Sequence, residues 1–267
     1  MSKYSGELVT ALKKINWLGL GVFAGLLVLW EVCARFDPLL SRYFPGIGAI
    51  AEAFFNATIS GELPKHLFAT VGRVIAGYVL SAAIAVTLGV ILGYFRRSYS
   101  CAEILIEFLR PMPSVAMIPV AILLLGIGSP MIIAVTVYAS VWPILINAID
   151  GVRGVEPTLI ETGRTFGLGG WGIFKTIVLP AALPYIATGL RISLAIALIL
   201  VTTAEMVVGG SGLGFFILDE ERSLRIGNMY AGIALVAILG YSLNRLFVFV
   251  ERSALAWHAG MTTRGLE

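Results

Sequence analysis

The chain has 267 residues, of which 58% are hydrophobic and only 13% charged, and its net charge is +3. Because soluble domains carry about 25% charged residues, this composition argues against a soluble globular domain. The small positive balance comes from loops and argues against a nucleic-acid partner. Two cysteines (Cys33, Cys101) and two histidines (His66, His258) show no metal-ligand spacing and no disulfide framework, and both histidines are interpreted as solvated side chains near loops. The sequence therefore predicts a membrane protein in contact with lipid, without a metal site.

Long apolar segments predict helices that cross the membrane, because a bilayer core of about 30 Å needs about 20 helical residues. In chain order the predicted spans are 15–36, 72–95, 108–126, 130–149, 183–208 and 226–250. A Gly-Ile-Gly-Ser-Pro turn at 126–130 separates the third and fourth. Pro111, Pro113 and Pro119 should kink the third, either as a packed kink or as a bent helix lining a pore. The expected fold is one all-α membrane domain over residues 1–267.

Two Gly-x-x-x-Gly pairs, Gly21–Gly25 and Gly89–Gly93, lie in the first and second predicted spans. Such pairs allow helices to approach closely. Packing within one bundle is favoured over contact between two copies.

Lysine and arginine residues are distributed unevenly between the two sides of a six-span chain. Twelve fall at the two ends and in the loops after the second and fourth spans, whereas six fall on the opposite side. The positive-inside rule then predicts that both termini and the 150–182 loop are cytoplasmic. A signal peptide is the competing interpretation of the first span, but residues 31–35 lack a small-residue cleavage site, so a retained helix is expected.

The 150–182 loop contains the stretch ETGRTFGLGGWGIFKTIVLP, from Glu161 to Pro180, which is too polar for lipid yet rich in apolar side chains. Pro157 favours a helix start, and Gly167 favours a left-handed stop after a helix over 158–166. A second short helix is predicted over 171–178. The two helices would lie on the membrane surface, pack under the bundle, or dock into a groove on another protein.

This stretch resembles the cytoplasmic signature of binding-protein-dependent ABC importer permeases. That signature reads Glu-Ala-Ala, three residues, Gly, nine residues, Ile, one residue, Leu-Pro. Every spacing agrees, although Thr162 and Gly163 replace the usual alanines and Gly163 weakens the helix by about 1 kcal/mol. Segments within 70–250 are similar to the sulfonate, taurine and nitrate branch. The matching signature residues are Glu161, Thr162, Gly163, Gly167, Ile177, Leu179 and Pro180.

The resemblance implies a type I ABC importer-like permease fold in which 150–182 is a coupling-helix pair. It implies a homodimer in the bacterial inner membrane, two ABC ATPase subunits and a periplasmic substrate-binding protein. The cargo would be a small anion such as a sulfonate, taurine, nitrate or an aromatic carboxylate. The chain shows no Walker-type loop, so no catalytic residue is expected. ATP and Mg would bind the partner ATPases, and no cofactor would bind this chain.

Two charges lie within the fifth predicted span, Arg191 and Glu205. They fall within about 40° of one helix face but about 21 Å apart. Charges in a span usually face the protein interior or a water-filled cavity. Glu205 would either make a structural or interfacial bond, or hold an outer gate through Arg73, which is selected by depth. Phe215 and Phe216, after a glycine-rich turn, are candidates for closing that gate.

The alternative function is an ion-coupled secondary transporter that uses Glu205 and Arg191. Such carriers commonly show internal repeats. No repeat relates residues 1–130 to 131–267, so the importer permease is preferred.

Overall fold

A computed structural model of the chain describes residues 17–36 and 42–255. All regular elements within these residues are helices. In chain order they are α2 (Trp17–Phe36), α3 (Ile47–Ile59), α4 (Glu62–Tyr94), α5 (Arg96–Leu109), η2 (Ser114–Met117), α6 (Ile118–Leu125), α7 (Ser129–Arg153), α8 (Pro157–Thr165), α9 (Gly170–Ile173), η3 (Phe174–Val178), α10 (Leu179–Val208), α11 (Leu213–Arg222) and α12 (Ile226–Ala254).

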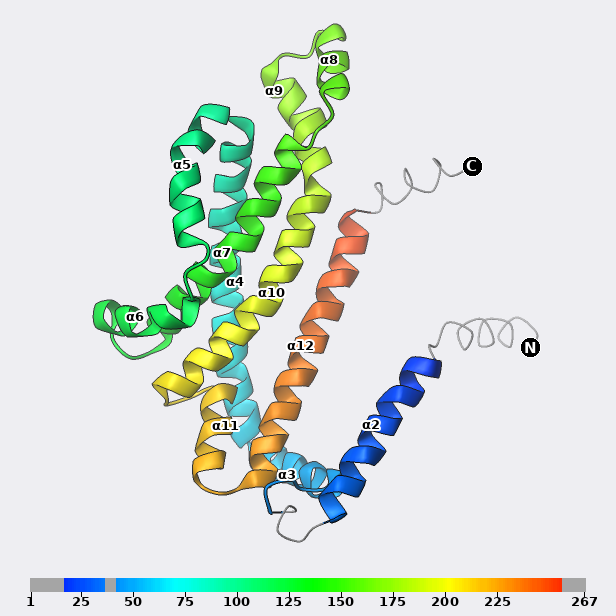
Figure 1. Cartoon of the computed structure of the whole chain (residues 1–267), viewed down its shortest axis with the longest axis vertical. Helices are drawn as coiled ribbons and strands as arrows, with labels where there is room; N and C mark the ends of the chain where they lie inside the picture. Colours follow the sequence, from blue (N-terminus) through cyan, green and yellow to red (C-terminus); the bar gives the residue numbers. More distant parts are fainter. Residues whose placement is uncertain (1–16, 37–41, 256–267) are drawn as a thin grey trace, which may run out of the picture.

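Long helices run along the long axis of the molecule (Figure 1). The helices α8 and α9 lie at one end, α3 and α11 lie at the other, and α2 stands apart from the upper part of α12. Within the described residues, four segments are long and apolar enough to cross a membrane, and a fifth results if one bent pair counts as a single span. Those four are Glu62–Tyr94, Ser129–Arg153, Gly170–Val208 and Ile226–Ala254.

The region of the third predicted span differs from a single kinked helix. Here α5 and the η2–α6 segment form a pair bent by 89°. The loop expected after the second predicted span is instead the helix α5. The charged residues of α5 lower its average hydropathy, so a search for apolar segments does not find this helix. Its Tyr99 and Ile106 nevertheless pack against the buried residues Ile144 and Leu145 of α7. The break falls beside Pro111 and Pro113, which cannot continue a helix without losing backbone hydrogen bonds.

Small residues let α4 and α10 approach α7 closely. A Cβ atom added at Gly89 would lie 2.5 Å from the Cβ of Ala148, and one at Gly93 would lie 2.7 Å from the Cβ of Val152. This contact confirms packing within the bundle for the second glycine pair. In contrast, added Cβ atoms at Gly21 and Gly25 would meet nothing within 4 Å. Close packing matters here because lipid tails are as apolar as the side chains they would replace.

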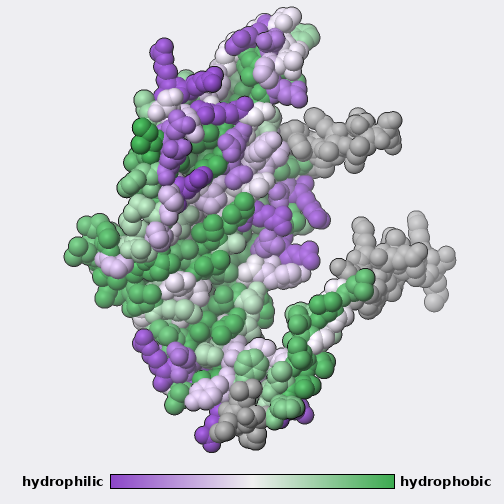
Figure 2. Space-filling model, viewed as in Figure 1, coloured by the Kyte–Doolittle hydropathy of each residue, from purple (hydrophilic) through white to green (hydrophobic). Residues whose placement is uncertain are grey.

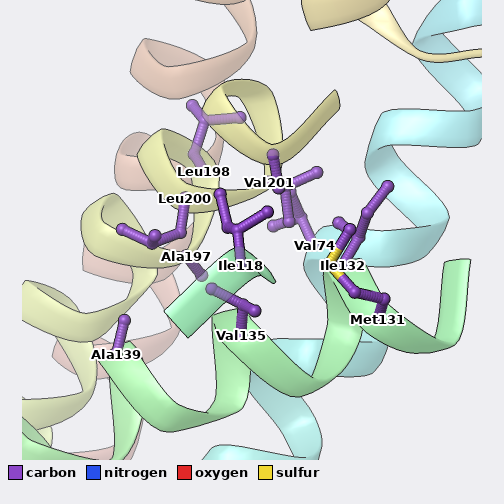
Figure 3. Packing of buried hydrophobic residues seen from close by; sticks show 11 residues of the cluster. Val74, Ile118, Met131, Ile132, Val135, Ala139, Ala197, Leu198, Leu200 and Val201 are labelled. Carbon is purple, nitrogen blue, oxygen red and sulfur yellow. The ribbon is translucent and has the colours of Figure 1, made fainter. Parts of the chain in front are cut away.

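The main core lies where α4, α6, α7 and α10 meet (Figure 3). A second buried cluster joins the α8/α9 end to the bundle through Val152 and Val155, Ile173, Val178 and Ala182. A third cluster joins α3, α4, α11 and α12 around Leu63, Leu213 and Phe216. The long helix α4 contributes to both ends, because Val86 and Val90 pack against the second cluster and Leu63 belongs to the third.

Candidate functional site: the 150–182 segment, a buried ion pair and an intramembrane arginine

The 150–182 segment reverses direction between two short helices. The chain turns at Gly167, whose φ is 79°, a left-handed value that favours glycine. The N–H of Gly167 donates to the carbonyl of Arg164 at 2.9 Å, and that of Leu168 donates to Gly163 at 3.0 Å. These bonds close the end of α8, as the sequence predicted from Gly167.

Gly163 and Ile177, two residues of the signature, face each other across this turn. A Cβ atom at Gly163 would lie 2.7 Å from Cδ1 of Ile177. The two helices therefore approach closely at Gly163, and a larger residue there would require the end of the Ile177 side chain to shift. Leu179 and Pro180 lie where the π-helical stretch η3 passes without a break into α10.

The apolar side chains of this segment divide into inward and outward groups. Ile173 and Val178 are buried in the cluster that reaches α7 and α10. Phe166 is 82% exposed and Trp171 75% exposed, and Glu161 is exposed beside them in the chain. The sequence showed only that the whole set was too apolar for a free loop. Exposed aromatic side chains at one end of the molecule are typical of a contact surface.

The α9 helix is fixed to the end of α4 by aromatic contacts. The ring of Trp171 stacks on Phe174 with centroids 5.3 Å apart, and Phe174 meets Tyr94 edge-on at 5.1 Å. The hydroxyl of Tyr94 donates to the carbonyl of Gly170 at 3.3 Å. A displacement of α9 would therefore be transmitted directly to α4.

Arg73 of α4 and Glu205 of α10 form a buried ion pair near the α3/α11 end. Arg73 Nη1 lies 2.6 Å from Glu205 Oε1, and the Glu205 side chain is 0% exposed. Oε2 of Glu205 accepts from Thr70 Oγ1 at 2.8 Å and from the Gly214 N–H at 3.1 Å. Burying a carboxylate is costly unless it is paired and hydrogen-bonded, and this one is both.

The same side chains tie the loop between α10 and α11 to α4. Arg73 donates from Nη1 to the carbonyl of Ser211 at 2.7 Å and from Nη2 to Ser211 Oγ at 2.6 Å. The Leu213 N–H donates to Thr70 Oγ1 at 2.8 Å. A Cβ at Gly212 would overlap the Glu205 carboxylate, and one at Gly214 would overlap the carbonyl of Thr202. Both glycines are therefore required for this close approach.

Sequence reasoning selected Arg73 and Glu205 but missed the other members of this network. His66 is not a solvated loop residue, because it lies in α4, where its Nδ1 accepts a 3.0 Å bond from the Gly212 N–H. The centroid of its ring lies 5.7 Å from the ring centroid of Phe215 and 5.5 Å from that of Phe216. His258 lies outside the described residues. The closely spaced glycines between α10 and α11 were the available sequence signal. They predict a tight loop, whose backbone N–H groups need hydrogen-bond partners elsewhere in the protein.

Phe215 and Phe216 lie in the first turn of the helix α11, which follows the glycine-rich loop and begins at Leu213. Phe216 is 3% exposed and belongs to the third buried cluster. Their expected part in a gate stays a prediction.

Arg191 has different surroundings from Glu205, although both lie in α10. It is exposed, and its Nε donates to Oδ1 of Asn244 in α12 at 3.2 Å. No salt bridge joins Arg191 to a carboxylate anywhere in the described part of the chain. The two charges of the fifth predicted span therefore do not act as a pair.

The long apolar helices, packed side by side, define the class of a multi-pass helical membrane protein. Residues 85–255 match the family described as binding-protein-dependent transport system inner membrane component, and the chain belongs to that family. It is 34% identical to a putative ABC transporter permease of Methanocaldococcus jannaschii, over 88% of this chain and 89% of that protein. The ABC importer permease resemblance is thereby confirmed.

Two further relatives carry more specific names. The chain is 29% identical to a putative aliphatic sulfonates transport permease of Bacillus subtilis, over 92% of this chain and 89% of that protein. It is 31% identical to a nitrate import permease of Synechocystis, over 85% of each. Among solved structures, the inward-facing MetNI methionine ABC transporter matches with a TM-score of 0.61 at 20% identity, over 70% of this chain and 93% of that one. That likeness supports the fold alone.

Proposed function

We propose that this permease carries a small anion through the membrane after delivery by a separate binding protein. The observation that carries this proposal is the set of relatives named for their cargo. Two of those relatives are named for aliphatic sulfonates and for nitrate. A third, from Synechocystis and 33% identical over 72% of this chain, is named for bicarbonate. All three are small oxyanions. Taurine and aromatic carboxylates share that negative oxygen-bearing group.

The proposed assembly contains two copies of this chain, two ATPase subunits and one periplasmic binding protein. The chain would cross the bacterial inner membrane six times, with α2 as the first span and the bent α5/α6 region as the third. The lysine and arginine asymmetry supports cytoplasmic termini and a cytoplasmic α8/α9 end. ATP and Mg would bind the ATPases, and this chain would bind no cofactor.

The α8/α9 pair is proposed as the surface that docks on the ATPase. Exposed Phe166 and Trp171 supply apolar contact area, and Glu161 supplies a charge for a basic partner group. Tyr94 and the buried cluster below α9 would carry a displacement into α4, α7 and α10. An amphipathic helix in a groove is a common recognition mode.

The Arg73–Glu205 pair is proposed as a fixed bracket that holds the α10–α11 loop and α11 against α4. Support comes from the complete bonding of the carboxylate by Arg73, Thr70 and Gly214. Opening such a pair would strand a charge in a low-dielectric interior. The sequence-based hypothesis that this pair forms an outer gate stays a separate prediction. The thermal stability of single variants distinguishes the bracket from the gate.

The function is tested by reconstituting the permease with its ATPase and binding protein in proteoliposomes. Uptake of nitrate, bicarbonate or an alkanesulfonate should require all three components and internal ATP. Uptake by the permease alone, driven by a proton or sodium gradient, would support the secondary transporter instead.

A further inference from the structure

Arg191 lies about midway along the 39-residue apolar segment Gly170–Val208. The part of this helix up to residue 182 belongs to the proposed cytoplasmic end, so the membrane-crossing part is 183–208. Arg191 then lies about 12 Å from the cytoplasmic end of that part, within the roughly 30 Å bilayer core. The side chain is nevertheless exposed in the single chain. A positive charge that faces lipid at such depth is costly, and arginines there normally face the protein interior or a water-filled cavity.

Arg191 is not the only polar side chain on this part of the surface. Its neighbour Asn244 is also exposed and lies in α12. Hydrophilic surface interrupts the apolar body beside the upper half of α12, on the side that faces α2 (Figure 2). Arg191 and Asn244 are therefore two exposed polar side chains in contact across α10 and α12.

The geometry leaves most of the guanidinium available for a ligand. Asn244 accepts the Nε–H bond and so restricts the orientation of the group. Within the described residues, neither Nη1 nor Nη2 of Arg191 has a hydrogen-bond or carboxylate partner. Two N–H groups held in a plane match two oxygens of a carboxylate, sulfonate or nitrate.

A cavity of about 230 Å³ lies beside the guanidinium group of Arg191, between α10 and α12. Apart from Arg191 and Asn244 its lining is apolar, with Leu194, Leu198 and Leu243 among the wall residues. An apolar wall lowers the local dielectric and strengthens the attraction between the fixed positive charge and an anion. It offers no carboxylate to a cation.

From these observations we infer that Arg191, positioned by Asn244, forms an oxyanion-binding site on the wall of the translocation pathway. The inference rests on the proposed function and deepens it, since it assigns selectivity for negative charge to this chain as well as to the binding protein. The ligand class is a small oxyanion with at least two terminal oxygens. A neutral or cationic solute would find no complementary group there.

The test uses the complete complex of permease, ATPase and binding protein in proteoliposomes. The probe is whichever of nitrate, bicarbonate and ethanesulfonate the unmodified complex imports. Arg191→Gln, Arg191→Lys and Asn244→Leu are compared with Arg222→Gln, which removes an equal charge from the exposed end of α11. Uptake and binding-protein-stimulated ATP hydrolysis are measured on the same preparations.

Arg191→Gln should lower uptake about tenfold or more while ATP hydrolysis stays close to normal, because a hydrogen bond to a charged group is lost. Arg191→Lys should keep part of the uptake, because lysine retains the positive charge but lacks the planar pair of N–H donors. Asn244→Leu should fall between them, and Arg222→Gln should match the unmodified complex.

The outcomes separate this inference from the proposed function. If the unmodified complex imports none of the three anions, the proposed cargo class is wrong. If it imports one and Arg191→Gln imports it equally well, only the oxyanion site is refuted. If Arg191→Gln and Arg191→Lys both fail to assemble with the ATPase, Arg191 is a structural residue and the site is likewise refuted.

Discussion

Arg73 on α4 and Glu205 on α10 form an ion pair with an N–O distance of 2.6 Å, and both partners also bond the loop that leads to α11. The pair therefore joins three elements that are distant in sequence. Its side chains are 12% and 0% exposed. Because removing one partner of a buried pair leaves an uncompensated charge, this site should be sensitive to single substitutions.

Glu205→Ala and Arg73→Ala should each destabilise the permease by about 3–5 kcal/mol and impair transport. The exchanged double variant, Arg73→Glu with Glu205→Arg, should recover part of both properties. The matched control is Arg35→Ala, which breaks the exposed pair between Arg35 and Glu31 and should change stability by less than about 0.5 kcal/mol. Thermal unfolding of the purified complex gives the stability.

The same experiment distinguishes the bracket from an outer gate. A gate that opens in every cycle predicts single variants with normal melting behaviour and ATP hydrolysis that no longer depends on the binding protein. Normal melting of both single variants would contradict the bracket. Normal transport by both single variants would contradict the bracket and the gate alike.

Gly167 and Gly169 provide a matched pair of glycines in the turn after α8. Gly167 has φ 79°, whereas Gly169 has φ −69°, and neither has an atom within 4 Å of an added Cβ. Gly167→Val should therefore cost about 1–3 kcal/mol of backbone strain and weaken ATPase attachment, while Gly169→Ala should be tolerated. Pull-down of the ATPase with the purified permease measures the attachment. Equal binding by both variants would show that the left-handed turn is not needed for docking.

Phe166 and Glu161 are predicted to contact the ATPase from the same short helical region. Phe166→Ala should weaken the complex by about 2 kcal/mol, since aromatic anchors dominate interface energies. Glu161→Lys should weaken it through repulsion from a basic groove. Neither change should alter the melting temperature of the permease alone, because both side chains are exposed. Stoichiometric ATPase binding together with normal transport in the Glu161→Lys variant would remove Glu161 from the interface.

The orientation can be tested with single cysteines in a background lacking Cys33 and Cys101. A cysteine at Thr165 in α8 should react with a membrane-impermeant thiol reagent only after vesicles are opened, whereas one at Ser223, after α11, should react in intact spheroplasts. Thr165 is exposed, and Ser223 lies at the opposite end of the molecule. Labelling of the Thr165 position in intact spheroplasts would overturn the proposed topology.

The sequence by itself determined the class of this protein and the place of its signature. Apolar segments located the four long membrane helices because spanning length and internal backbone bonding leave no other solution. The spacing from Glu161 to Pro180 located the short helices α8 and α9, since proline and glycine act on the backbone locally. These are properties of adjacent residues, and no distant contact is needed to define them.

Only the tertiary structure decided which charges have partners and which side chains face outward. Arg73 and Glu205 are joined because the packing of α4 on α10 brings residues 132 positions apart to hydrogen-bonding distance, whereas Arg191 turns towards Asn244. The same packing buries Ile173 and leaves Phe166 and Trp171 exposed. It also sets the 89° bend between α5 and the α6 region, where prolines permit a break but do not fix its angle. Such outcomes depend on which helix faces meet, and hydropathy along the chain carries no information about that choice.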